Sequence, residues 1–366
     1  MSEGPRVTVC IPTFRRPRML ERAVRSVLGQ TYAQLRVAVY DNASGDETAA
    51  VMERLCRADA RVEYHAHEKN IGAGANFDFA MAHVWTPFFS LLSDDDLLLP
   101  GFLEEAMSAL DAHPEAAFFC SRIIIYSEIV PGIRRRQHSW PAGVYAPGAE
   151  VTCRMLRDNF ANTGVVFREE VRESVGSFSR FPTDRDYMAV AASKHSFVVS
   201  EREHAVFIVH AGSFTAADPS KLEEPERLVS VRFARDSLFS SIPPLLAGDC
   251  FSSDDKTAIF QTAMQLARGD TLYLLLIKAL PAGRFSEIDE ALVLARWMGF
   301  GLSMRVFLRL LRAAGRVPIL RRWMARALGV VATMATKRLY EPFDAPRNRE
   351  LVAFVEAMTR AAPAES

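Results

Sequence analysis

An apolar segment of this chain runs directly into three consecutive carboxylates. Residues 88–92 read Phe-Phe-Ser-Leu-Leu and lead into Ser93-Asp-Asp-Asp96. Carboxylate oxygens suit Mg²⁺ or Mn²⁺, and Mg²⁺ is usually held by one or two carboxylates together with the phosphates of a substrate. The sequence therefore predicts a divalent-cation site with a nucleotide diphosphate as its ligand. A structural interpretation stays open, in which an Asp only caps the helix that Pro100 begins.

The elements that would position these carboxylates alternate between strands and helices. Strands are expected at 7–11, 35–40, 61–65 and 87–92, and helices at 18–28, 46–55 and 72–83. This alternation indicates right-handed βαβ units, and hence an α/β fold with a Rossmann-like, mainly parallel sheet flanked by helices. Ligands of such sheets bind outside the carboxyl ends of the strands. Thr13, Asp41 and the acidic run all fall at those ends.

Four ordered motifs at these strand ends carry a family resemblance. They are Ile11-Pro-Thr-Phe-Arg-Arg-Pro17, Tyr40-Asp-Asn-Ala-Ser-Gly-Asp46, Asn70-Ile-Gly72 with Asn76, and Ser93-Asp-Asp-Asp96. Together they resemble the motifs of family 2 inverting glycosyltransferases with the A-type fold of nucleotide-diphospho-sugar transferases. The resemblance covers about residues 6–215. It implies a transferase domain over residues 1–215, and we expect a mostly helical region over residues 216–366.

The resemblance also implies roles for single residues. The nucleotide-sugar donor would be bound by Pro12, Thr13, Arg15, Asp41, Asn42, Asn70, Gly72, Asn76, Asp94 and Asp95. Asp41 would accept hydrogen bonds from the base, Asp94 would face the ribose, and Asp96 would bind the metal that bridges the phosphates. Taken singly, Asp41 is also a turn former and Gly72 a glycine that starts a helix.

Two further segments should complete the site. Thr183-Asp-Arg-Asp-Tyr187 resembles the acidic motif that carries the catalytic base in the family. Asp184 is the closest match, but Asp186 remains an alternative because an acid is missing before Asp184. Asp184 would also cap a helix well. His210 follows a strand expected at 205–209 and resembles a histidine that completes the metal or diphosphate site in part of the family, although such a histidine is also often structural.

The implied activity is metal-dependent, inverting transfer of a sugar to a hydroxyl of a glycan or lipid-linked glycan. A divalent ion neutralises charge on the departing diphosphate, and one carboxylate takes the proton of the acceptor. A nucleotidyltransferase is an alternative, but the first strand is not followed by the Gly-rich loop typical of that class. A second alternative is a membrane-surface binding protein that is not an enzyme and keeps a transferase-like fold.

Composition places the chain among globular proteins of more than one structural unit. It has 366 residues, of which 49% are hydrophobic. Its 5 cysteines show neither close pairs nor zinc spacing, which indicates a reducing compartment. The first residues lack an apolar signal segment, and each apolar run is far shorter than the ~20 residues of a spanning helix. We therefore expect a cytoplasmic protein.

Charge is distributed unevenly although the chain carries 44 basic and 44 acidic residues. Residues 291–340 contain ten Lys and Arg residues and not one acid. Arg305, Arg309, Arg312 and Arg316 recur at helical spacing, which predicts a basic amphipathic helix on an anionic membrane surface at the inner face of the membrane.

Other interpretations of this basic stretch stay open. In a packed helical domain, the arginines would pair with acids such as Glu223, Glu224 and Glu226. Packing between copies in a homo-oligomer is also compatible with the pattern. A nucleic-acid partner is not expected, because no aromatic-interleaved basic strand is present. Separately, residues 131–148 are rich in Pro and Gly and are expected to form a solvated loop, with a mobile loop near the active site as the alternative.

Overall fold

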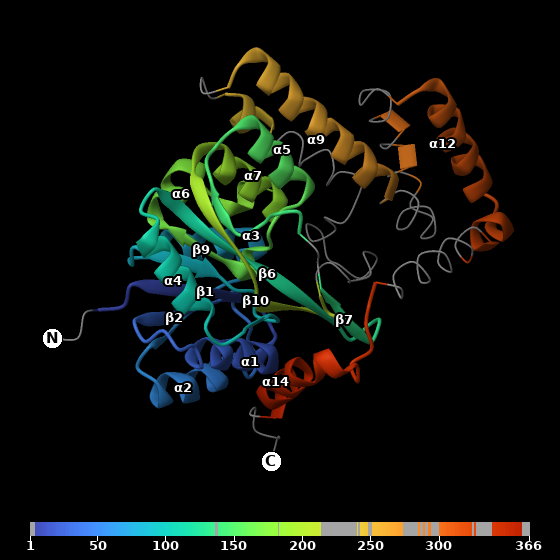
Figure 1. Ribbon diagram of the computed structural model, residues 1–366. Helices are drawn as coiled ribbons and strands as arrows, with labels where there is room; N and C mark the ends of the chain where they lie inside the picture. Colours follow the sequence, from blue (N-terminus) through green and yellow to red (C-terminus); the bar gives the residue numbers. More distant parts are fainter. Residues whose placement is uncertain are drawn as a thin grey trace.

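The centre of the molecule is a ten-stranded sheet (Figure 1). The computed structural model describes residues 4–135, 138–181, 183–213, 240, 242–247, 251–273, 285, 288–289, 292–293, 300–323, 326 and 339–360. The strands are β1 (Val7–Thr13), β2 (Leu35–Asp41), β3 (Val62–Ala66), β4 (Phe88–Leu91), β5 (Leu97–Leu98), β6 (Ala116–Ser127), β7 (Gly132–Arg135), β8 (Gly143–Tyr145), β9 (Val165–Arg168) and β10 (Ser196–Val209).

The sheet joins a parallel half to a mixed half. Its order is β3-β2-β1-β4-β9-β6-β10-β5, with β7 beside β6 and β8 beside β10. The first four strands of this order are mutually parallel, as are β6 and β10, whereas β9 is antiparallel to both β4 and β6. The expected α/β class is therefore confirmed. The four parallel strands leave the carboxyl ends of β1, β2 and β4 side by side at one edge.

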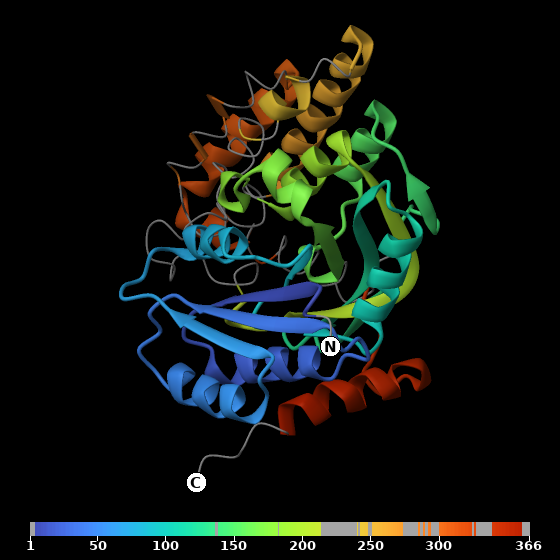
Figure 2. The same cartoon turned by 90° about the vertical axis from the view of Figure 1, so that its left-hand side faces the viewer.

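Helices cover both faces of the sheet (Figure 2). On one face, apolar residues of α1, α2 and α4 share a core with β1 and β2, and on the other face α5, α7 and α9 contribute to a second core. None of the described helices is long and apolar enough to cross a membrane. The helices are α1 (Pro17–Leu28), α2 (Thr48–Ala58), α3 (Ala73–Ala82), α4 (Phe102–Ala112), α5 (Ala149–Arg157), α6 (Glu169–Val175), α7 (Asp184–Lys194), α9 (Ser253–Tyr273), α12 (Leu302–Gly315) and α14 (Arg349–Arg360), with 3₁₀ turns η1 (Asn162–Gly164), η2 (Phe178–Arg180) and η4 (Pro346–Asn348).

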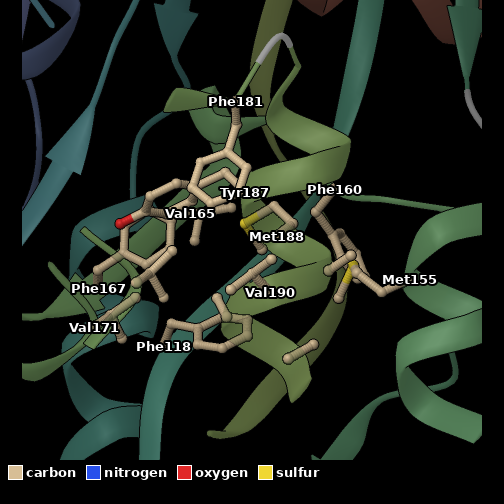
Figure 3. Packing of buried hydrophobic residues seen from close by; sticks show 14 of the residues in the cluster. Phe118, Met155, Phe160, Val165, Phe167, Val171, Phe181, Tyr187, Met188 and Val190 are labelled. Carbon is tan, nitrogen blue, oxygen red and sulfur yellow. The ribbon is translucent and has the colours of Figure 1, made fainter. Parts of the chain in front are cut away.

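Helix α7, which begins at Asp184, is fixed firmly on the sheet. Its Tyr187 and Met188 are fully buried, and the Tyr187 ring meets the Phe167 ring of β9 edge to face with centroids 5.9 Å apart. Figure 3 shows these side chains packed together with Val165 of β9. A closely packed core of this kind allows little freedom to the helix that it holds. The first turn of α7 is therefore held in a defined place relative to β9.

A short strand places the acidic run beside the end of β10. β5 follows the acidic residues at once and pairs antiparallel with β10, with Leu97 opposite Val206. β10 then continues to Val209, so that His210 comes next to the acidic turn. Only the last part of β10 was expected from the sequence, which predicted a strand at 205–209. The observed strand begins at Ser196 and pairs in parallel with β6.

The segment 131–148 is not the solvated loop that its composition predicts. β7 pairs antiparallel with β6 and β8 pairs antiparallel with β10. Trp140 lies between these two strands in sequence and is 1% exposed, with its indole N–H donating to the Asp158 carbonyl oxygen at 2.7 Å. Pro and Gly here mark strand ends, and burial of the large indole ring anchors the segment.

The last helix among the described residues returns to the central sheet, next to α1 (Figure 1). Leu351 and Val355 of α14 are buried against Ile133, Val206 and Ile208 of β7 and β10. The domain boundary expected at residue 215 stays a prediction, but α14 lies beyond it and still completes this core. The same core includes Leu97, which follows the acidic run directly. The C-terminal helix thus supports the strands that carry the acidic turn.

Polar contacts fix the approach to this helix. Ile133 and Glu341 exchange two backbone hydrogen bonds of 2.8 and 2.7 Å. A Cβ at Gly132, where φ is +155°, would lie 2.6 Å from the Glu341 carbonyl oxygen, so that glycine is required there. The Arg135 guanidinium donates to Asn348 Oδ1 at 2.6 Å.

We expect Leu351→Ala to lower the free energy of unfolding by about 2–5 kcal/mol, because it leaves a cavity in this core. Urea denaturation followed by circular dichroism measures the effect. Glu350→Ala is the matched control, since Glu350 is the exposed neighbour on the same helix. Equal midpoints for the two variants would show that α14 does not pack against the sheet in solution.

Candidate active site

The carboxyl end of β2 holds Asp41 in a closed set of hydrogen bonds. One of its oxygens accepts from the Ser44 backbone N–H at 3.0 Å and also from the Ser44 hydroxyl. The other accepts from the Tyr64 hydroxyl of β3 at 2.7 Å. Arg15 follows β1 and donates its backbone N–H to Ser44 Oγ at 2.8 Å. The predicted binding residues Arg15 and Asp41 are thus joined through a serine and lie at adjacent strand ends.

The asparagine motif is tied to the same place. Asn42 donates its side-chain N–H to Asn70 Oδ1 at 2.9 Å, and its own Oδ1 accepts from the Ile71 backbone at 2.8 Å. Gly72 donates to Asn70 Oδ1 at 2.8 Å and has φ +88°, a conformation that favours glycine. Asn76 is buried and donates to the Tyr40 carbonyl oxygen at 2.8 Å. These bonds order the segment between β3 and α3 against the end of β2.

Arg16 joins the first motif to the acidic run. Its guanidinium donates to Asp94 Oδ1 and to Asp95 Oδ2, at 3.0 Å each. Thr13, at the end of β1 and next to Pro12, donates its hydroxyl to Asp94 Oδ2 at 2.7 Å. Burial lowers the pKa of Arg16, but the nearby Asp94 and Asp95 carboxylates outweigh this effect, so that its pKa is raised. Burial raises the pKa of Asp94, and Arg16 opposes that rise.

His210 contacts the same carboxylate pair. Its Nε2 lies 3.1 Å from Asp95 Oδ2, and its Nδ1 accepts the Gly212 backbone N–H at 3.1 Å. Because Nδ1 accepts, the proton of a neutral ring is on Nε2, which therefore donates to Asp95. The Arg16 guanidinium also donates to the Gly212 carbonyl oxygen at 2.6 Å. His210 therefore lies beside the acidic run, in contact with Asp95, and its role as a metal or diphosphate ligand stays a prediction.

Asp96 is enclosed and does not face solvent. It is 0% exposed and accepts hydrogen bonds from Thr163 Oγ1 at 2.6 Å and from the Ile208 backbone N–H at 3.0 Å. Burial, and next the neighbouring Asp95 charge, raise its pKa well above the ordinary value. A metal ligand at a strand end would be expected to face the ligand space. Asp95 is the most exposed of the three acids, at only 9%.

One 3₁₀ turn brings the acidic run to the predicted base. Thr163 of η1 holds Asp96, and the preceding Asn162 donates its backbone N–H to Asp184 Oδ2 at 3.4 Å. A Cβ at Gly164, which ends this turn, would lie 2.9 Å from Ser121 Oγ, so the turn fits closely against β6. The carboxylates of Asp96 and Asp184, far apart in sequence, are thus held by two consecutive residues.

The two acids of the 183–187 motif have different surroundings. Thr183 is the N-cap of α7, and its Oγ1 accepts the Asp186 backbone N–H at 3.2 Å. The Thr183 hydroxyl also donates to Asp186 Oδ2 at 2.6 Å, and Asp186 is 1% exposed. This arrangement is similar to a capping box, in which residue N3 turns back to the cap. Asp184 is half-buried at the first position of the helix.

The site contains the types of side chain that bind divalent cations, but the described side chains do not converge on one point. Carboxylates and an imidazole suit Mg²⁺ or Mn²⁺. However, no three His, Cys, Asp or Glu side chains within the described ranges converge as a metal centre. The Arg16 guanidinium already lies between Asp94 and Asp95 and supplies positive charge to them.

The family of the domain follows from these motifs in their observed places. The family model described as "Glycosyl transferase family 2" matches residues 8–176. This part of the chain belongs to glycosyltransferase family 2. The matched span contains the ends of β1, β2 and β4 and the η1 turn. It ends before Asp184 and His210, whose roles stay predictions.

Curated relatives match parts of the chain. A Campylobacter jejuni protein named GalNAc(5)-diNAcBac-PP-undecaprenol beta-1,3-glucosyltransferase is 33% identical over 104 residues, which are 28% of this chain and 34% of that protein. An uncharacterized glycosyltransferase of Haemophilus influenzae is 22% identical over 138 residues, 38% of this chain and 43% of that protein. The chain thus spans less than half the length of these two relatives.

A solved structure extends the likeness of fold. The crystal structure of S. aureus TarS 1–349 in complex with UDP-GlcNAc superposes with a TM-score of 0.60 and 14% identity, and the match covers 90% of this chain and 92% of that one. At this identity the likeness shows the fold alone. It agrees with the A-type architecture that the sequence motifs imply.

Several residues that shape the site of this family 2 domain were not singled out from the sequence. They are Arg16, Ser44, Tyr64, Asn162 and Thr163. Arg16 lies inside a quoted motif, and the presence of a second cation directly after Arg15 was a usable signal. Tyr64 lies in the strand expected at 61–65, where a hydroxyl is unremarkable, and Thr163 lies outside every quoted motif. Only the sheet order shows that Tyr64 faces Asp41 and that Thr163 faces Asp96.

Proposed function

We propose that this protein transfers a sugar from a nucleotide-diphosphate sugar to a hydroxyl of a glycan or lipid-linked glycan, with inversion at the anomeric carbon. The observation that carries the proposal is the η1 turn, which holds Asp96 of the acidic run and Asp184 through two consecutive residues. A donor bound along the strand ends would then have a carboxylate near its sugar. Membership of glycosyltransferase family 2 favours this reaction over nucleotidyl transfer.

The donor would bind along the ends of β1, β2 and β4. Asp41 would accept from the base, while the backbone around Pro12 and Thr13 would contact the nucleotide. Asp94 would receive the ribose hydroxyls, because it lies next to Thr13. Arg16 would place positive charge close to the phosphates, since it contacts both Asp94 and Asp95. Its guanidinium geometry suits phosphate oxygens as well as carboxylates.

Asp184 would act as the general base. A carboxylate on the face of the sugar opposite the departing diphosphate can take the proton of the acceptor hydroxyl as the new bond forms. One base with in-line attack inverts the anomeric centre, whereas two-carboxylate hydrolysis needs an acid on the leaving-group side. Asp186 is a poor candidate for this role, because it is buried and paired with the cap residue Thr183.

Mg²⁺ or Mn²⁺ is the proposed cofactor, with Asp96 and His210 as the ligands that the family resemblance implies; Asp95 precedes Asp96 and contacts His210. A bound divalent ion would act as a Lewis acid on the diphosphate oxygens. The side chains themselves keep the site polar and enclosed: Asp94, Asp95 and His210 are all at most 9% exposed.

The proposed acceptor is a hydroxyl of a glycan or of a lipid-linked glycan. The name of the Campylobacter jejuni relative includes PP-undecaprenol. We infer that the transfer takes place at the cytoplasmic face of a membrane, where a lipid-linked acceptor would lie.

A thermal-shift screen tests donor and cofactor together. We expect one of UDP, GDP and dTDP to raise the melting temperature in the presence of Mn²⁺, because a ligand that binds only the folded state stabilises it by RT ln(1 + [L]/Kd), about 2.7 kcal/mol at a hundredfold excess over Kd. Each nucleotide without metal, and Mn²⁺ alone, serve as controls. Equal melting temperatures with all three nucleotides and with buffer would contradict a nucleotide-diphosphate donor.

A further inference from the structure

Large apolar side chains are exposed on α12 and just after it. Most of the large hydrophobic residues found exposed among the described residues lie in 293–323. Leu302, Leu310 and Trp323 are 69%, 64% and 69% exposed, respectively. Single exposed apolar residues are common, but a group of this kind indicates a surface that contacts a membrane or a partner. We call it the α12 face: Leu302, Val306, Leu310, Val317, Ile319, Leu320 and Trp323.

The spacing within α12 gives this surface a direction. Leu302, Val306 and Leu310 recur every four residues and therefore lie along one side of the helix. Leu308, on the other side, is 1% exposed, so that the helix packs inward there. In both overall views α12 lies on the outside of the molecule, away from the sheet (Figures 1 and 2). One side of α12 thus holds it to the protein, and the opposite apolar side faces outward.

Positive charge borders the same surface. Arg309, Arg322 and Arg326 are exposed, and the stretch 291–340 contains no acid. Not every arginine of the helix takes part. Arg312 donates to Asp289 Oδ2 at 2.8 Å, and Arg316 lies 5.9 Å from the centre of the Phe285 ring. The expected basic stripe is therefore divided: Arg312 and Arg316 hold α12 to its neighbours, and Arg309 remains at the edge of the outward apolar side.

We propose that the α12 face lies in the plane of an anionic phospholipid membrane, with its apolar side chains among the acyl chains and Arg309, Arg322 and Arg326 at the phosphates. Amphipathic helices with basic borders bind in this way, and Trp favours the interfacial depth. A second copy of this chain fits the surface less well. A two-fold contact would set the same arginines of both copies close together with no acids between them.

Vesicle co-sedimentation of the full chain tests this proposal without any sugar transfer, so its outcome is independent of the proposed activity. We expect binding to vesicles of phosphatidylglycerol and phosphatidylcholine, weaker binding to phosphatidylcholine alone, and loss of affinity as salt rises. Equal binding to both vesicle types at low salt, or binding to neither, would overturn the proposal.

Two variants separate the apolar and the charged contributions. Leu302→Ser with Leu310→Ser and Trp323→Ser should lower the partition coefficient at least tenfold at every salt concentration, because apolar burial is not screened. Arg309→Gln with Arg322→Gln and Arg326→Gln should lower it on the order of 100-fold at low salt and flatten the salt dependence.

Matched controls lie elsewhere on the surface. Ile129→Ser changes an apolar side chain that is 50% exposed, and Arg57→Gln changes an arginine side chain that is 76% exposed. Neither should alter vesicle binding. Analytical ultracentrifugation of the same set detects self-association. A wild-type dimer that the three serine substitutions dissociate, with vesicle binding unchanged, would show that a second copy covers the α12 face and would refute the membrane contact.

Discussion

Replacing Asp184 by Asn should lower the rate of sugar transfer by about 10²–10⁴-fold, the usual contribution of a general base. Asn keeps the shape of the side chain, and its amide oxygen can still accept the Asn162 backbone N–H. What it loses is the capacity to take a proton. Donor binding should therefore persist, with a thermal shift from the nucleotide equal to that of the wild-type protein. Initial rates with a donor that supports turnover measure the loss.

Asp186→Asn is the matched control for this experiment. Asp186 accepts from the Thr183 hydroxyl at the start of α7, so its replacement should cost about 1 kcal/mol of stability, as loss of a cap does. Its transfer rate should stay within about tenfold of the wild-type rate below the melting transition. If the two variants exchange these behaviours, Asp186 is the base and Asp184 has a structural role in the first turn of α7.

The second large effect concerns Asp96. Asp96→Asn should keep the fold, because the amide oxygen can accept the Ile208 N–H while the amide N–H donates to Thr163 Oγ1 in reversed polarity. Asp96→Ala removes both acceptors. Its free energy of unfolding should be about 2 kcal/mol or more lower than that of the Asn variant, since unsatisfied buried donors cost ~1–3 kcal/mol each. Thermal denaturation without ligand compares the two.

Both Asp96 variants should lose the stabilisation that a nucleotide gives in the presence of Mn²⁺, because neither side chain can supply a carboxylate to the metal. Asp95→Asn provides the comparison, as Asp95 is the most exposed of the three acids and contacts His210. Should Asp96→Asn keep the full metal-dependent shift while Asp95→Asn loses it, the metal ligand is Asp95, and Asp96 has a structural role. The thermal shift with UDP, GDP or dTDP and Mn²⁺ reports this without enzymatic assay.

The parallel half of the sheet was predictable because its signals are local. Each of the first four strands is a short apolar run that ends in a polar motif, and the observed bounds of β1, β2, β3 and β4 differ from the expected ones by at most two residues. The placement of Thr13, Asp41 and the acidic run at one edge then follows from parallel pairing. The order of the motifs along the chain indicated the family, and this inference needs no knowledge of the tertiary contacts.

The mixed half depended on contacts between distant segments. Trp140 lies in a Pro- and Gly-rich stretch, but burial of its ring against neighbouring strands outweighs the local preference for a loop. The return of α14 is equally invisible in sequence, since an amphipathic helix does not specify the surface that it will cover. Leu351 finds its partners only because β7 and β10 leave an apolar face next to α1.

The sequence determined which side chains could do chemistry. The tertiary structure decided which partners each of them contacts, and hence which role each can have. Three consecutive aspartates are alike in sequence, yet Arg16 and Thr13 hold Asp94, His210 holds Asp95, and Asp96 is enclosed by Thr163 and Ile208. The physical reason is that adjacent residues of a tight turn point in different directions and meet different strands. In the same way Asp184 and Asp186 differ because the N-cap residue Thr183 binds Asp186, which is buried, and leaves Asp184 half-buried.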